Sequence, residues 1–219
     1  MTVPALILWD IDHTLVEIKG VSREIYAQAF QLVTGRPMRE LADMTGRTER
    51  AIIIETLRLS GITDPDPLLP AFYQALGDAA EGLESRMREV GRRLPGAHEA
   101  IAGLVAGGTV QSVVTGNLRA IAQTKLDAFG LTEHLDFEVG GYGDDDSDRA
   151  VLVRLAVKRA EASYDAMFPP ERVVVIGDTL HDIKGAHGAG CRAVGVATGS
   201  KHRRGTFRGR GRCCAPRPD

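Results

Sequence analysis

Two aspartates and a threonine near the start of the chain have the types and spacing for metal-dependent chemistry. Asp10, Asp12 and Thr14 come directly after the apolar run 5–9, whose length is typical of a buried parallel strand. Ligand sites in open α/β sheets lie outside the carboxyl ends of strands. Residues two apart in extended backbone point the same way. We therefore expect Asp10 and Asp12 to face one reaction centre.

Two carboxylates this close repel each other unless a cation lies between them. A hard dication such as Mg²⁺ prefers oxygen ligands and typically takes one or two carboxylates together with a phosphate. A carboxylate can also act as a nucleophile and form an acyl-phosphate. The alternative interpretation is a strand that ends in a polar turn, with Thr14 as a helix cap.

A hydroxyl ends a second expected strand, at residues 110–115, and an amide follows it. Thr115, Gly116 and Asn117 combine a side-chain oxygen with backbone N–H groups that open a helix, which is a natural cradle for phosphate. The alternative is that Thr115 only caps the helix that begins at Leu118.

Two further carboxylates follow the expected strand 173–176. Gly177 permits a tight turn, Asp178 stands at the strand end, and Asp182 lies one helical turn further on. Asp178 as a helix cap and Asp182 as a favourable first-turn charge would explain either acid alone. That alternative does not explain acid pairs at two separate strand ends.

A cation is needed beside the carboxylates, and four basic residues precede the last acid pair: Lys125, Arg149, Arg154 and Lys158. Lys125 lies inside an expected helix, where we predict that it is solvated. Arg149 follows the acidic loop 143–148 and opens the next helix near the expected site, so we select it. The alternative is a surface arginine that pairs with Asp145 or Asp148, and the choice between Lys125 and Arg149 stays open.

Composition sets limits on fold and location. The chain has 219 residues, 43% of them hydrophobic, and a net charge of −2, so the chain as a whole is not a polyanion binder. No apolar stretch approaches the ~20 residues that span a bilayer, and the start lacks the features of a signal peptide. Cys191, Cys213 and Cys214 have neither metal-ligand nor disulfide spacing. We expect a reducing, cytoplasmic setting and no membrane partner; the sequence gives no oligomeric state.

Apolar runs alternate with helical patterns, which predicts an α/β fold with a doubly wound parallel sheet. The expected strands are 6–9, 110–115, 137–139, 173–176 and 193–196. The expected helices after residue 95 are 118–129, 148–167 and 180–189.

Residues 16–95 break this alternation. They contain helical patterns at 22–33, 48–59 and 67–90 and no convincing strand, which predicts an all-helical cap domain inserted into a core of residues 1–15 and 96–199. Insertions at the ligand edge of a sheet often act as lids. Within this segment, Arg47 follows Thr45 and Gly46 and precedes a helix, so it could bind an anionic substrate. The alternative is an ordinary turn between helices.

Residues 200–219 do not match the rest of the chain. They are rich in arginine and glycine and almost devoid of aliphatic side chains, so they cannot bury enough apolar surface to fold. One hypothesis is a disordered or frame-shifted tail, since a GC-rich gene read in the wrong frame gives this composition. The rival is a genuine tail that binds nucleic acid. We favour the frame shift, so we do not expect a nucleic-acid partner.

Taken together, Asp10-x-Asp12-x-Thr14, Thr115, a basic residue and Gly177-Asp178-x₃-Asp182 resemble the motifs of the haloacid dehalogenase-like hydrolase superfamily. The layout is most similar to the phosphoglycolate-phosphatase-type members, which have a helical cap between the first two motifs. The resemblance covers about residues 5–199. It implies a Rossmann-like core, Mg²⁺ as the cofactor and a small phosphorylated metabolite as the substrate.

The resemblance also implies a role for each motif residue. Asp10 would attack phosphorus and form an aspartyl-phosphate, and Asp12 would protonate the leaving oxygen, activate water and give its backbone carbonyl to the metal. Phosphate would bind at Thr115, Gly116 and Asn117, with Arg149 where the family commonly has lysine. The metal would be held by Asp10, Asp12 and Asp178, with Thr14 and Asp182 supporting these ligands.

Two features refine the expected activity. Asp12 is typical of the phosphatases and argues against carbon–halogen cleavage. His13 occupies a place that is commonly glycine, where it either narrows the entrance or contacts the substrate, or is simply tolerated in a turn. We predict a Mg²⁺-dependent phosphomonoester hydrolase; the alternatives are a sugar-phosphate mutase and a binding module that kept the fold.

Overall fold

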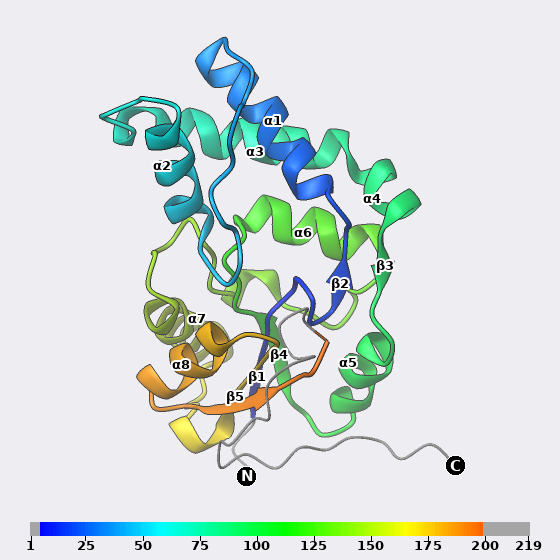
Figure 1. The fold of residues 1–219 in the computed structure, drawn as a ribbon. Helices are drawn as coiled ribbons and strands as arrows, with labels where there is room; N and C mark the ends of the chain where they lie inside the picture. The colour runs from blue at the N-terminus through cyan, green and yellow to red at the C-terminus, as the bar shows by residue number, and fades with distance from the viewer. Residues whose placement is uncertain (1–4, 199–219) are drawn as a thin grey trace.

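The computed structural model describes residues 5–198, and a four-stranded parallel sheet lies at its centre (Figure 1). The strand order is β4-β1-β5-β6. β1 (Leu6–Trp9) is fully buried and pairs on one side with β4 (Val110–Val113) and on the other with β5 (Val173–Gly177). β6 (Arg192–Gly195) is the edge strand beside β5. Because β1 is central, the residues that follow it lie in the middle of the carboxyl edge of the sheet.

Helices cover both faces of the sheet, which confirms the doubly wound α/β fold. Leu6 and Leu8 pack with α7 (Arg149–Tyr164) and α8 (Leu180–Gly188). Ile7 and Trp9 point to the opposite face, where they pack with α5 (Ala97–Val105) and α6 (Arg119–Ala128). This alternation follows from the period of two in a strand.

A second group of helices lies beyond the carboxyl edge, coloured from blue through cyan to green in Figure 1. The group consists of α1 (Val21–Thr34), α2 (Glu49–Leu59), the 3₁₀ turn η1 (Asp66–Leu68), α3 (Leu69–Gly82) and α4 (Glu84–Val90). These helices bury their own apolar cluster, in which the rings of Phe30 and Phe72 meet edge to face at 6.1 Å. Leu118 and Ile121 belong to the same cluster, so the start of α6 joins this helical group to the sheet.

Three predictions about secondary structure are wrong in detail. Residues 137–139 form a 3₁₀ turn, η2 (Phe137–Val139), because the Asp136 carboxylate accepts a hydrogen bond from the Glu138 N–H and caps the turn. Residues 16–95, called the cap segment below, contain two short strands, β2 (Val16–Glu17) and β3 (Arg92–Arg93). These strands pair antiparallel where the chain leaves and re-enters the sheet region. The helical pattern at 67–90 is divided into η1, α3 and α4.

The fold leaves several of the predictions made from the sequence untested. The 3₁₀ turn η3 (Pro170–Arg172) leads into β5 and completes the elements of the described chain. The proposed boundaries of core and cap stay a prediction. Both hypotheses for the basic tail concern residues that lie outside the described ones. Within residues 5–198, no helix combines the length and apolar character needed to cross a bilayer.

The sheet core generates a stability prediction. Leu8 is fully buried between β4, β5 and α7, so Leu8→Ala removes buried methyl groups and leaves a cavity. We expect a loss of about 2–5 kcal/mol in the free energy of unfolding. Leu32→Ala, at a side chain that is 72% exposed, is the control and should cost about 0.5 kcal/mol or less. The free energy of unfolding of both variants is measured by urea-induced unfolding. Equal losses in Leu8→Ala and Leu32→Ala would contradict this assignment of the core.

Candidate active site

Three buried carboxylates meet at the carboxyl edge of the sheet. Each of Asp10, Asp178 and Asp182 offers one oxygen, and these oxygens lie within 4.8 Å of one another. Asp10 follows β1 and Asp178 follows β5, and the Asp10 N–H donates to the Ile176 carbonyl at 2.8 Å, which brings the two strand ends together. Gly177 has a packing role, because a Cβ there would lie 2.4 Å from the carboxyl carbon of Asp182.

Burial of these acids is electrostatically unfavourable without a cation. Desolvation raises the pKa of Asp10 well above its ordinary value, the charge of Asp182 raises it further, and Arg149 offsets part of the effect. Desolvation and the charge of Asp182 also raise the pKa of Asp178 to about 6. One carboxylate oxygen of Asp178, Oδ1, is buried without a hydrogen-bond partner. Unpaired hard oxygens in this arrangement fit a divalent cation such as Mg²⁺.

Asp182 both stabilises the start of α8 and contributes an oxygen to the acidic cluster. Its Oδ2 accepts hydrogen bonds from the Thr179 N–H at 3.0 Å and the Thr179 hydroxyl at 2.6 Å. The Asp182 N–H donates to the Thr179 hydroxyl oxygen at 3.3 Å, which completes a capping box at the start of α8. Its Oδ1 points to the acidic cluster and lies 3.2 Å from Arg149 Nη2. The cap of α8 therefore also orients an oxygen of the site.

Arg149 lies against the acidic cluster. Its Nη1 is 3.6 Å from Asp10 Oδ1, and its side chain is only 10% exposed. The alternative, a surface arginine paired with Asp145 or Asp148, does not hold, because Asp145 pairs with Arg159 and Asp148 caps α7. Gly185 makes room for Arg149, since a Cβ there would lie 2.4 Å from its Cγ.

The prediction that Lys125 is solvated is wrong. Lys125 is 2% exposed, and its Nζ lies 2.8 Å from both carboxylate oxygens of Asp12 and from Asn117 Oδ1. Burial alone would raise the pKa of Asp12, but the charge and hydrogen bond of Lys125, with a hydrogen bond from Asn117, hold it below the ordinary value. A signal for this burial exists in the sequence: Lys125 stands seven residues after Leu118, on the same apolar stripe of α6 as Ala122. The site thus has two cations with different partners: Arg149 beside Asp10 and Asp182, and Lys125 beside Asp12.

The Thr115–Asn117 turn connects these groups. Thr115 Oγ1 accepts hydrogen bonds from the Asn117 N–H at 3.2 Å and Nδ2 at 2.8 Å, and Nδ2 also lies 2.8 Å from Asp12 Oδ2. Thr115 does not cap the following helix, because α6 begins at Arg119 with Leu118 as its N-cap. The turn therefore links the end of β4 to Asp12.

Gly116 lets the helical group approach the sheet closely. A Cβ at this position would lie 2.0 Å from the Arg47 carbonyl oxygen. The Glu49 N–H donates to the Gly116 carbonyl at 2.7 Å, so the start of α2 is bound directly to the turn. Glu49, which the sequence analysis missed, is buried, and desolvation raises its pKa to about 7 although the Tyr26 hydroxyl donates to it.

Three remaining candidates have different surroundings. The Thr14 hydroxyl lies 3.4 Å from Asp10 Oδ2. His13 has φ 60°, in the left-handed region that favours glycine, which accounts for glycine being common there in the family. The Arg47 guanidinium lies within the cap segment, on Glu55 and on the Ala51 carbonyl at 3.2 Å. The structure does not bring it to the acidic cluster, and its contact with substrate stays a prediction.

The raised pKa of Asp178 predicts a pH-dependent stability. Between its ordinary value of 3.8 and about 6, the folded protein keeps a proton that the unfolded chain releases. The stability from this proton is complete below pH ~4 and is lost as the pH rises through about 6. We expect the melting temperature of metal-free protein to fall less between pH 5 and pH 8 in Asp178→Asn than in the wild type. Asp64→Asn, at an exposed acid, is the control; if Asp178→Asn shows the wild-type fall, the burial argument is wrong.

The comparisons with known proteins agree with this geometry. Residues 7–196 match the family model described as haloacid dehalogenase-like hydrolase. A phosphoglycolate phosphatase from Caulobacter vibrioides is 26% identical over 200 residues, which are 89% of this chain and 80% of the relative. Tyrosine-protein kinase PtkA from Mycobacterium tuberculosis is 28% identical over 90% of this chain, but the match spans only 63% of that protein. A structure of CbbY from Rhodobacter sphaeroides in complex with xylulose-(1,5)bisphosphate has a TM-score of 0.66 at 21% identity and covers 95% of this chain and 92% of its own. With most of its length matched by the family model, the chain belongs to the haloacid dehalogenase-like hydrolases.

Proposed function

We propose that this hydrolase is a Mg²⁺-dependent phosphomonoesterase that acts on a small phosphorylated metabolite through an aspartyl-phosphate on Asp10. One observation carries the proposal: the buried acids Asp10, Asp178 and Asp182 lie within 4.8 Å of one another, with a buried arginine on the first of them. The phosphatase name of the Caulobacter relative supports the same class of reaction.

Mg²⁺ would be held by the carboxylates of Asp10 and Asp178 and the backbone carbonyl of Asp12, with Asp182 supporting them. The fit rests on the unpartnered, buried Oδ1 of Asp178 and on oxygen being the donor atom throughout. When bound, the ion supplies positive charge that offsets the repulsion between carboxylates and substrate phosphate. The chain itself supplies the nucleophile, the proton transfers and the remaining cations.

In the first step, a carboxylate oxygen of Asp10 attacks phosphorus and the bond to the ester oxygen breaks. Asp12 gives a proton to the departing oxygen from its protonated form, which its lowered pKa makes the minor form in the free protein. The Thr115 hydroxyl with the N–H groups of Gly116 and Asn117 binds the phosphoryl oxygens. In the second step, water attacks the phosphorus of the aspartyl-phosphate and Asp12 takes its proton. Arg149 orients Asp10 and balances its charge, so catalysis depends on positioning and charge stabilisation.

Lys125 favours the ionised form of Asp12, which is the form that the second step requires. Loss of this cation raises the pKa of Asp12 and slows the removal of water's proton. We expect Lys125→Met to lower steady-state turnover of p-nitrophenyl phosphate by about tenfold or more. The loss should fall on the second step, so stopped-flow measurements should show a burst of p-nitrophenol.

Lys158→Met is the matched control, because Lys158 is exposed on α7 and away from the site. It should behave as the wild type. Full activity without a burst in Lys125→Met would show that the ion pair with Asp12 has no part in turnover.

Asp10→Asn removes the nucleophile while keeping the size of the side chain. We expect phosphate release from a panel of phosphorylated metabolites to fall by at least about 10³-fold, with the unfolding transition retained. Asp64→Asn should keep full activity. Wild-type turnover in Asp10→Asn would eliminate the nucleophile assignment.

The same assay separates the alternatives. A mutase would isomerise a sugar phosphate with little phosphate release, whereas the proposed enzyme releases phosphate in proportion to substrate consumed. A wild-type protein without Mg²⁺-dependent release from any member of the panel would favour a binding module that kept the fold.

A further inference from the structure

Residues 140–148 form the loop between η2 and α7 and carry four aspartates that the proposed reaction does not use. Each of the four carboxylates accepts at least one hydrogen bond. The donors are the N–H groups of Arg119, Tyr142, Asp148 and Ala150 and the guanidinium of Arg159. These aspartates therefore order the loop, and the contact between Asp145 and Arg159 has the strongest geometry among them.

Arg159, on α7, fixes the loop through a bidentate ion pair. Its Nη1 and Nη2 each lie 2.6 Å from one carboxylate oxygen of Asp145, and Nη1 also donates to the Gly140 carbonyl at 2.5 Å. The Tyr142 N–H donates to the same carboxylate at 3.0 Å. Burial alone would raise the pKa of Asp145, but these hydrogen bonds hold it below the ordinary value, so Asp145 stays ionised. Bidentate pairing fixes the relative orientation of the two groups as well as their distance.

The loop is bonded in turn to the Thr115–Asn117 turn through backbone groups. The Thr115 N–H donates to the Gly141 carbonyl at 3.0 Å, and the Gly143 N–H donates to the Asn117 carbonyl at 2.8 Å. Gly143 permits this close contact, because a Cβ there would lie 1.8 Å from the Gly116 carbonyl oxygen. The loop therefore holds both ends of the turn.

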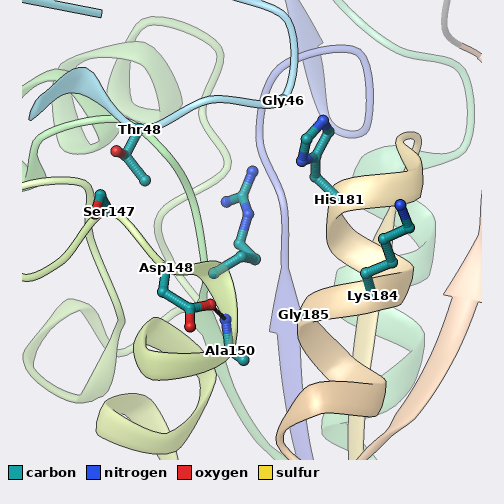
Figure 2. A pocket seen from close by; sticks show the side chains of 9 residues that line it. Gly46, Thr48, Ser147, Asp148, Ala150, His181, Lys184 and Gly185 are labelled. Carbon is teal, nitrogen blue, oxygen red and sulfur yellow. Dashed lines mark hydrogen bonds between the residues drawn. The ribbon is translucent and has the colours of Figure 1, made fainter. Parts of the chain in front are cut away.

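The other end of the loop leads directly into Arg149. Asp148 accepts a hydrogen bond from the Ala150 N–H at 2.8 Å and so caps α7, whose first residue is Arg149. Figure 2 shows this bond beside a pocket of about 240 Å³, which lies between Thr48 on the cap segment and α8. The loop thus connects the Thr115–Asn117 turn with the arginine beside Asp10.

Resting on the proposed function, we propose that Asp145 and Arg159 are positioning residues for phosphoryl transfer. Their ion pair fixes the loop, and the loop fixes the turn that binds the phosphoryl oxygens and orients Asp12 through Asn117. A displacement of about 1 Å at a reacting group can cost about 100-fold in rate. A pair that does not bind the substrate can therefore control both phosphate affinity and turnover.

Arg159→Met tests the proposal, because it removes the guanidinium and keeps an apolar side chain. Affinity for inorganic phosphate is measured by calorimetry with Mg²⁺ present, and turnover of p-nitrophenyl phosphate is measured beside it. We expect phosphate to bind about tenfold more weakly and kcat/KM to fall about tenfold or more. The melting temperature should fall by about 4 °C or less, because a partly exposed ion pair contributes little to stability.

Arg154→Met is the matched control. Arg154 lies on the same helix and also donates to a backbone carbonyl, that of Gly188 at 3.0 Å, but this carbonyl belongs to α8 and not to the loop. Phosphate affinity and turnover of this variant should equal those of the wild type.

A double-mutant cycle with Asn117→Ala separates positioning from a merely structural role. The Asn117 side chain bonds Thr115 and Asp12, so its removal frees the turn from the groups that the loop positions. In the Asn117→Ala background, we expect the loss of phosphate affinity from Arg159→Met to shrink from about tenfold to about threefold or less. Independent effects would multiply instead. Asp145→Asn keeps the size of the side chain and should show the same coupling, which provides a second variant if Arg159→Met does not fold.

Wild-type phosphate affinity in Arg159→Met, an equal loss in Arg154→Met, or losses that multiply in the double variant would overturn the proposal. A wild type that binds no phosphate would overturn it as well. A wild type that binds phosphate but releases none from any ester would instead contradict the proposed function. The comparison of phosphate affinities would still decide whether the ion pair positions the turn.

Discussion

Mutual repulsion among buried carboxylates is the constraint on which this site depends. At 4 Å, two like charges near a protein surface repel by about 4 kcal/mol, and desolvation adds to this for Asp10 and Asp178, whose pKa values are both raised. Nearby cations offset part of this repulsion. Arg149 lies on Asp10 and Asp182, while Lys125 lies on Asp12. Three of the four acids are therefore divided between two basic partners, whereas Oδ1 of Asp178 is buried without a hydrogen-bond partner.

This division gives the two N-terminal acids different properties. Asp10 faces other acids and has a raised pKa, whereas Asp12 is held by an ammonium group and an amide and has a lowered one. The raised pKa of Asp10 opposes the ionised form that a nucleophile needs, so a cation bound at the acidic cluster would be required to restore that form. The lowered pKa of Asp12 favours its ionised form, which suits the base of the second step. The division arises from topology: Asp10 turns toward the end of β5, and Asp12 turns toward α6, which follows β4.

The site also depends on the close approach of the helical group to the sheet. It depends on Gly116, whose missing side chain admits the Arg47 carbonyl, and on the hydrogen bond from Glu49 to the same turn. A single turn thus orients Asp12 through Asn117 and positions the cap segment. The pocket between Thr48 and α8 exists because these two parts of the chain meet there.

Much of this arrangement could be predicted from the sequence, because apolar runs mark strands and polar residues at their ends mark the ligand edge. That logic located β1, β4 and β5, and the structure brings Asp10, Asp178 and Asp182 together at one edge of the sheet. The expectation that Asp12 joins them is not met by its carboxylate, which bonds Lys125 and Asn117 instead. The same logic failed for Lys125, because lysine usually lies in solvent, whereas this position belongs to the apolar face of α6 that packs toward Asp12. It also failed for residues 137–139, where a local cap by Asp136 outweighed strand propensity. Contacts between cap and core, such as Glu49 with Gly116, join distant segments and leave no local pattern.

The central claim is that the acidic cluster holds one divalent ion beside a nucleophilic Asp10. A crystal structure with Mn²⁺ and beryllofluoride tests this most directly, because manganese is located by anomalous scattering and beryllium bonds to a nucleophilic carboxylate in place of phosphorus. We predict one manganese ion coordinated by Asp10 and Asp178, and beryllium bonded to an Asp10 oxygen. Manganese bound elsewhere, or beryllofluoride without a bond to Asp10, would contradict the account.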